Sequence, residues 1–114
     1  MEFLRFEDLE TYEPSGHAGV VNRLLVGKAN LAVQEVSVWH GLLHPGGRSD
    51  LHVHSTSLQI YVGLTGSMVV GNGQEEEELK PRATAYFQVG ENHFIENRSK
   101  EDAEVLVISV PGLR

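Results

Sequence analysis

Twelve glycines divide this chain of 114 residues into short segments, and none keeps a 3.6-residue apolar period long enough for a helix. The segments between the glycines are instead rich in β-branched residues. In "LAVQEVSVWHGLL" (31–43), for example, Val36 and Val38 alternate with Ser37 and Trp39. The pattern therefore predicts an all-β protein.

We expect about eight short strands at regular spacing, which is typical of an antiparallel sandwich or barrel. The expected strands cover residues 31–43, 57–64, 83–89, 93–97 and 104–110, with a hairpin over 66–80 that turns at Asn72-Gly73. The "HPGG" that follows the first of these strands is a turn signal. Only "LRFEDLETY" (4–12) suits a helical turn.

Length and charge narrow the class of protein. A chain of 114 residues forms one domain with one modest core. Its net charge of −7 argues against nucleic-acid or anionic-membrane partners, which require a basic face. The absence of cysteine excludes disulfides and suits a reducing cytoplasm. The acidic "MEFLRFEDLETYEP" has no apolar segment of a signal peptide, and no apolar run approaches the ~20 residues of a membrane helix. We therefore expect a cytoplasmic protein.

A histidine pair suggests a metal site. His52 and His54 lie one residue apart, so on a strand they share a face at a spacing of roughly 7 Å. Across the short turn 55–57, Gln59 begins the partner strand and can face the same interior, and His93 offers a third imidazole. Three imidazoles and one oxygen donor suit Zn, Ni, Fe, Mn or Cu. Taken alone, however, a His-x-His pair in a strand is more often structural or exposed.

Two segments resemble the sequence motifs of the cupin superfamily. The first cupin motif, G-x5-H-x-H-x3,4-E-x6-G, is similar to the stretch from Gly46 to Gly66, in which every spacing fits and Gln59 replaces the glutamate. The second motif, G-x5-P-x-G-x2-H-x3-N, is similar to residues 82–97. Its later positions match at Gly90, His93 and Asn97, whereas Arg82 and Gln88 replace the first glycine and the proline.

This resemblance covers residues 29–112 and implies a single-domain jelly-roll β-barrel, the cupin barrel, within a domain of residues 1–114. It implies a divalent transition metal (Zn, Ni, Fe or Mn) held inside the barrel by His52, His54 and His93, with Gln59 as the fourth ligand. Small cupins commonly form homodimers, so residues 1–28 would pack on their own barrel or, through Phe3, Leu4 and Phe6, across a neighbour.

Gln59 bears on the chemistry of such a site. Three histidines and an amide leave a divalent ion near +2, whereas a glutamate would lower its charge to about +1. The less compensated ion is the stronger Lewis acid and is bound more weakly, which favours acid–base chemistry over oxygen activation. If Gln59 is not a ligand, a three-histidine set remains, and some cupin dioxygenases resemble that arrangement.

The ligand pattern resembles the small pectin-degradation cupins of the KdgF type, which convert unsaturated uronates to linear keto forms, and also the cupin polyketide cyclases. It implies an isomerase- or cyclase-type enzyme acting on a small-molecule substrate. The last strand offers only Ser109 where we would expect a carboxylate, so the uronate itself is not carried over. The alternatives are a three-histidine dioxygenase and a non-catalytic cupin that binds a metal and a small molecule.

Residues outside the ligand set also have expected roles. Tyr61 shares strand parity with Gln59, so it is the candidate catalytic residue, as an acid, base or hydrogen-bond donor, unless it is a buried structural tyrosine. His40 shares strand parity with Val36, Val38 and Leu42 and would face inward with them, supporting the site, or else lie exposed, rather than serve as a fifth ligand. The remaining residues are expected to be structural, exposed or without a supporting motif: His17, His44, Glu75–Glu78, Tyr86, Gln88 and Asn97.

Overall fold

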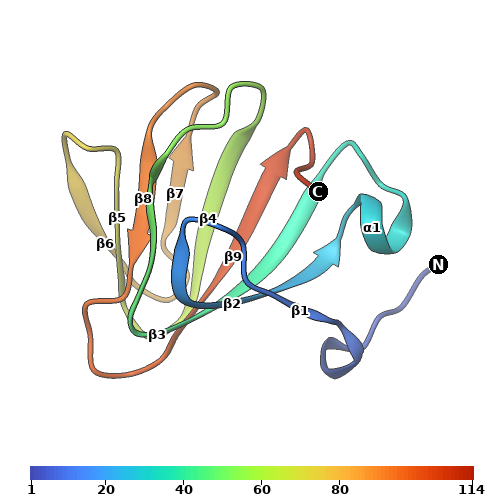
Figure 1. Ribbon diagram of the computed structural model, residues 1–114, viewed down its shortest axis with the longest axis horizontal. Helices are drawn as coiled ribbons and strands as arrows, with labels where there is room; N and C mark the ends of the chain where they lie inside the picture. Colours follow the sequence, from blue (N-terminus) through green and yellow to red (C-terminus); the bar gives the residue numbers. More distant parts are fainter.

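The computed structural model describes residues 1–114 and confirms the all-β jelly-roll prediction (Figure 1). Nine strands form one sheet whose pairings are all antiparallel and whose main order is β6-β5-β8-β3-β9-β4-β7. The sheet curls into a nearly closed barrel. Its elements are the 3₁₀ helix η1 (Phe6–Asp8), β1 (Thr11–Tyr12), β2 (His17–Val26), α1 (Lys28–Leu31), β3 (Ser37–His52), β4 (Leu58–Thr65), β5 (Met68–Gly71), β6 (Glu76–Leu79), β7 (Thr84–Phe87), β8 (His93–Glu96) and β9 (Ala103–Val110).

The later strands and the hairpin lie close to their expected positions, and η1 falls within the expected helical turn. The β5–β6 hairpin turns at Asn72, whose side-chain oxygen accepts hydrogen bonds from the backbone N–H groups of Gln74 and Glu75. Strand β6 is an edge of the sheet, and its exposed carboxylates are the solvated run expected there.

The expected strand 31–43 is wrong at both ends. It begins only at Ser37 because residues 28–31 form α1, and it continues through "HPGG" to His52. Instead of turning, β3 bends, pairing with β9 along residues 37–43 and with β8 along 48–52. Gly46 has a φ of +81°, and a Cβ on Gly47 would collide with the carbonyl oxygen of Gly19. The glycines therefore permit a bend against β2 within one continuous strand.

Two further pairings were not expected. Strand β2 lies before the expected core and pairs with β3 over most of its length, so the sheet, with β1 on β2, extends to Thr11. The short turn 55–57 had suggested that β4, the strand of Gln59, pairs with β3, but it does not. It pairs with β9 and β7 instead, because β9 lies between β3 and β4.

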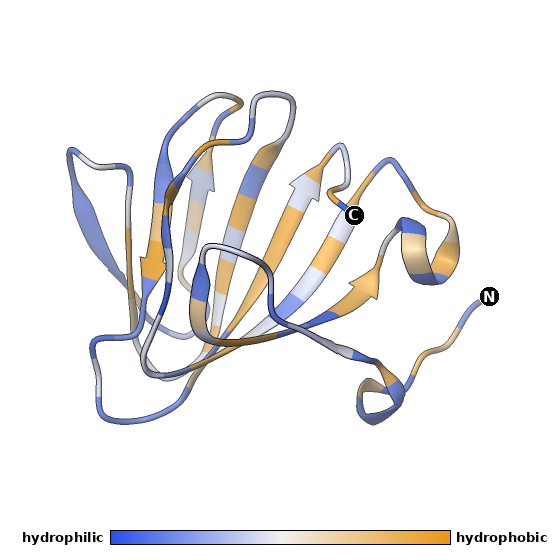
Figure 2. Ribbon diagram, viewed as in Figure 1, coloured by the Kyte–Doolittle hydropathy of each residue, from blue (hydrophilic) through white to orange (hydrophobic).

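The inside of the barrel holds the core. Hydrophobic side chains alternate along β4, which Figure 2 shows as separate orange bands, whereas β9 carries the continuous apolar run Val105–Ile108. Ten buried residues form one cluster, to which nearly every long strand contributes: Val20, Leu43, Tyr61, Met68, Val70, Leu79, Phe87, Ile95, Ala103 and Val105.

The opposite face of the same strands is also apolar. We call it the outer sheet face and define it as Val38 and Leu42 of β3, Leu106 and Ile108 of β9, and Ile60 and Val62 of β4, all partly exposed. His40 lies on this face, so its expected inward orientation is wrong. Its neighbours Trp39 and Gly41 line the interior cavity, and alternation places His40 outside.

The N-terminal segment lies beside the barrel, away from β5 and β6 (Figure 1). The Phe6 ring packs edge-on against His40 at 4.7 Å between ring centroids, and the Arg23 guanidinium stacks over Phe6 at 4.4 Å. Phe3, by contrast, is 75% exposed. The chain forms no helix with the length and apolar character needed to cross a membrane.

Candidate metal centre

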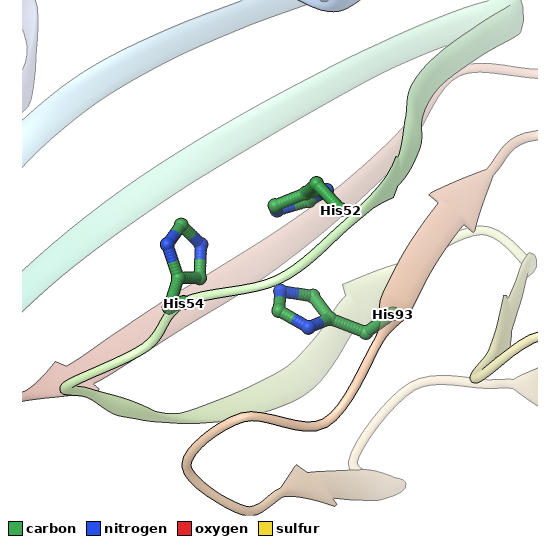
Figure 3. A group of neighbouring side chains, drawn as sticks. All are labelled: His52, His54 and His93. Atoms are coloured by element: carbon green, nitrogen blue, oxygen red, sulfur yellow. The ribbon is translucent and has the colours of Figure 1, made fainter.

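Three histidines from two strands and a loop converge inside the barrel. His52 is the last residue of β3 and lies directly opposite His93, the first residue of β8, while His54 follows in the loop after β3. Their ring centroids are 4.3 Å apart for His52–His93, 4.9 Å for His52–His54 and 5.1 Å for His54–His93. One nitrogen from each ring lies within 4.8 Å of the others, and Figure 3 shows the rings gathered around one space.

Backbone carbonyls fix the orientation of two of these rings. The Nδ1 of His52 lies 2.7 Å from the Asp50 carbonyl oxygen, and the Nδ1 of His93 lies 2.9 Å from that of Glu91. Because a carbonyl oxygen only accepts, each Nδ1 carries the proton and each Nε2 keeps a free lone pair. The Nε2 of His93 is buried without a hydrogen-bond partner. A metal ion would satisfy this nitrogen, so the residues present fit the metal that the resemblance implies.

The protonation of the histidines also suits a metal. Burial lowers the pKa of His93 to about 4. Burial, with the neighbouring His52 and His17, lowers the pKa of His54 below its ordinary value. Both rings are therefore neutral at pH 7, which is the form that binds a metal.

Gln59 and Tyr61 lie beside this centre in a buried hydrogen-bond chain. The Gln59 Nε2 donates to the Ser109 hydroxyl at 2.9 Å, and the Tyr61 hydroxyl donates to the Gln59 Oε1 at 3.2 Å. Burial raises the pKa of Tyr61, so this hydroxyl keeps its proton and acts as a donor. The Gln59 Oε1 retains a second lone pair, and its binding to a metal stays a prediction. The catalytic role of Tyr61 stays a prediction too.

The centre opens onto a cavity of about 420 Å³, the size of a small-molecule site. His52, His54 and Gln59 supply polar atoms to its lining. Apolar side chains from four strands form much of the remaining wall: Val20, Leu43, Ile95, Val105 and Val107.

The structure adds a fourth histidine that no sequence motif indicated. His17 begins β2, pairs with Ser49 of β3 and lines the cavity, with its ring centroid 6.2 Å from that of His52. Burial and the neighbouring His52 lower its pKa. The sequence contains no signal for His17 because its pattern did not predict β2. The register of β2 on β3 brings His17 to the site.

The other residues considered lie away from the centre. His40 bonds Glu104 at 2.6 Å on the outer sheet face, and the exposed His44 bonds Asp102 at 3.0 Å. Asn97 has the structural role expected of it, since its buried side chain donates to the carbonyl oxygens of Leu43 and Glu101. Tyr86 and Gln88 are exposed and do not line the cavity.

Barrel and histidines together define a small jelly-roll protein with a candidate metal centre inside it. The family model for the cupin domain (Cupin_2) matches residues 39–109, and the chain belongs to this family.

Known proteins and solved structures agree with this family. Auxin-binding protein T85 of Nicotiana tabacum is 29% identical over 108 residues, which cover 84% of this chain and 57% of that protein. The chain thus spans less than two thirds of this relative. A predicted oxalate decarboxylase from Thermotoga maritima superposes with a TM-score of 0.85 at 24% identity, covering 96% of this chain and 99% of the other. KdgF from Halomonas superposes with a TM-score of 0.83 at 14% identity, covering 97% and 94%. These two structures are similar in fold.

Proposed function

We propose that this chain is a metal-dependent cupin enzyme that acts on a small oxygenated substrate by keto–enol isomerisation, cyclisation or lyase chemistry. His52, His54 and His93 would hold a divalent metal, with Gln59 as the fourth ligand. One observation carries the proposal: three imidazoles converge beside a cavity of about 420 Å³, and the inward nitrogen of His93 has no protein partner.

A divalent metal bound there would supply a Lewis acid that stabilises an oxyanion developing on the substrate. The chain's own residues would prepare the site for it. The carbonyls of Asp50 and Glu91 hold two rings in the ligating tautomer. Tyr61 and Ser109 fix the side chain of Gln59. The apolar wall excludes water from the reacting oxygen, which strengthens the electrostatic interactions within the site.

Metal titration of substituted proteins tests the site. We expect His52→Ala and His93→Ala to weaken Zn²⁺ or Ni²⁺ binding by more than the ~10- to 100-fold typical of losing an outer partner of a metal ligand. His44→Ala should bind as the unsubstituted protein does, because His44 pairs with Asp102 outside the cavity. Full metal content in purified His52→Ala, measured by elemental analysis, would contradict the proposed site.

The same titration addresses the fourth ligand. Gln59→Glu should bind metal more tightly and turn over keto sugars, uronates or diketones more slowly, because the added negative charge weakens the Lewis acid. Unchanged affinity would remove Gln59 from the ligand set and favour the three-histidine alternative. Oxygen consumption by the Fe²⁺-loaded protein would then support a dioxygenase.

A second candidate is a cupin that binds a small molecule without transforming it. Two observations favour it: much of the cavity wall is apolar, and relatives of this chain bear the name auxin-binding protein. Saturable calorimetric binding of an auxin to the metal-loaded protein, without turnover of the oxygenated compounds, would favour this function over the enzyme. The cytoplasmic location of the chain stays a prediction.

A further inference from the structure

His17 is the one histidine lining the cavity that is neither in the close three-histidine group nor indicated by a motif. It belongs to β2, which pairs with β3 close to the metal centre. Its position follows from the register of this pairing, in which His17 lies opposite Ser49. Its ring lies 6.2 Å from the His52 ring, centroid to centroid. A group bound at the metal centre towards β2 would therefore lie close to His17.

The two nitrogens of His17 have different surroundings. Nδ1 is shielded from water and has no hydrogen-bond partner, whereas Nε2 makes no hydrogen bond within the protein and is not among the shielded, unpartnered atoms, so it is accessible. A buried N–H without an acceptor is costlier than an unpaired lone pair, so the proton of the neutral ring resides on the accessible Nε2. This tautomer is the opposite of those of His52 and His93, whose protons are held on Nδ1 by backbone carbonyls.

We infer that His17 donates its Nε2–H to an oxygen of the molecule bound at the metal centre, and that it is not itself a metal ligand. The inference rests on the proposed function only in requiring an oxygen-bearing ligand at that centre. A carboxylate or an enolate shares the necessary chemistry, since both present an anionic oxygen that accepts an N–H. His17 would thus stabilise the same negative charge as the metal, from the β2 side.

Several neighbouring groups that could donate a hydrogen bond to the bound molecule are already engaged. Tyr61 already donates to Gln59, and the Arg48 side chain engages the carboxylate of Asp50. The Arg114 guanidinium stacks over Tyr12 at 3.8 Å. Asn22 and His54 also line the cavity, but His54 belongs to the three-histidine group, and His17 is the imidazole outside that group whose ring lies 6.2 Å from His52.

The first test requires no ligand. Side-chain ¹⁵N NMR of the metal-free protein at pH 7.5 should show His17 as the Nε2–H tautomer, and His52 and His93 as Nδ1–H tautomers. Observation of the Nδ1–H tautomer at His17 would overturn the inference. This readout tests the tautomer of His17 whether or not the protein binds a metal, whereas a failure to bind metal would remove the proposed function.

The second test separates a ligand donor from a metal ligand and from a packing residue. Cobalt-loaded protein is titrated with benzoate, a carboxylate with an apolar body, and binding is followed in the visible spectrum of the metal. His17→Leu should lower benzoate affinity by about tenfold, the loss expected for a hydrogen bond to a charged group, and leave Co²⁺ affinity within about twofold. His17→Gln, whose amide N–H lies near the position of Nε2, should recover most of the benzoate affinity.

The matched control is His44→Leu, which removes an exposed imidazole outside the cavity and should change neither affinity. A tenfold or larger loss of Co²⁺ affinity in His17→Leu would make His17 a metal ligand and overturn the inference. Unchanged benzoate affinity in His17→Leu, or no benzoate binding by the cobalt-loaded unsubstituted protein, would overturn it as well.

Discussion

His93 shows how one residue links the candidate centre to the stability of the fold. It is 2% exposed and its Nε2 has no partner, so protonating the folded protein at this ring is unfavourable. Its pKa is about 4 in the folded chain, against an ordinary value of 6.5. As the pH falls through this interval the unfolded chain takes up a proton first, and the free energy of unfolding decreases.

We therefore expect the metal-free protein to be less stable at pH 5 than at pH 7, with the loss complete near pH 4 for this group. The depressed pKa values of His17 and His54 act in the same direction. Urea denaturation at pH 7 and pH 5 measures the difference. His93→Gln, which cannot titrate, should show a smaller decrease between the two pH values, and an equal decrease would contradict the assignment to His93.

At the residue scale, the sequence predicted which histidines come together better than it predicted their surroundings. The resemblance to the cupin motifs indicated one site for His52, His54 and His93, and the structure brings the three together, while their role as metal ligands stays a prediction. The bond from Gln59 to Ser109 could not be predicted, because it depends on which residue of β9 lies opposite Gln59. His17 was not predicted as a site residue for the same reason. Strand register is a tertiary property, and the order of residues along one strand does not determine it.

At the element scale, the bend in β3 determines where the three histidines of the candidate metal centre lie. The strand pairs with β9 before Pro45 and with β8 after Gly47, and this second pairing places His52 opposite His93. The backbone of Gly47 is packed against Gly19 and the carbonyl oxygen of His44, leaving no room for a side chain. Gly46 has open space around it and requires glycine only for its positive φ.

Alanine substitution should separate these two roles. Gly47→Ala should lower the free energy of unfolding by about 2–3 kcal/mol, because the new methyl forces backbone atoms apart. Gly46→Ala should cost only about 1 kcal/mol for its left-handed conformation. Chemical denaturation of both variants checks the order, and equal losses would show that the contact with Gly19 does not limit the bend.

The strands themselves were largely predictable, but which face points inward was not. Strand β9 reads Val105-Leu106-Val107-Ile108, an apolar run without alternation, so either parity could form the core. His40 was expected inside because it shares strand parity with Val38 and Leu42, and that apolar side of β3 proves to be the outer sheet face. The turn expected at "HPGG" was wrong because a Pro-Gly sequence marks a sharp change of direction in general. The chain can turn back there or, as in β3, bend within one strand.

At the scale of the whole molecule, the homodimer stays a prediction, and the outer sheet face offers a contact for it besides the N-terminal segment. Strands with apolar residues on both sides are typical of sheets that are covered on both sides. The chain carries a net charge of −7, yet Glu104, the carboxylate opposite Leu42 of this face, bonds His40 and Thr65. Two copies could therefore bring these faces together about a twofold axis without opposing free carboxylates.

We expect sedimentation at micromolar concentration to report a dimer, and Leu106→Lys or Ile108→Lys to convert it to a monomer that retains the fold. Val89→Lys is the control, because Val89 is 50% exposed but lies outside this face. A monomeric unsubstituted protein, or dissociation by the control substitution, would contradict an interface at the outer sheet face.

The central position of β9 also governs how the protein reaches this structure. Residues 37 and 109 are paired, so long segments must be closed before the cavity wall exists, and chains with such distant pairings fold in milliseconds to seconds. His52 and His54 are neighbours even in the unfolded chain, whereas His93 joins them only when β8 pairs with β3. If the three histidines bind a metal, a metal present during folding would meet a two-histidine site first, and the three-histidine site would exist only in the completed barrel.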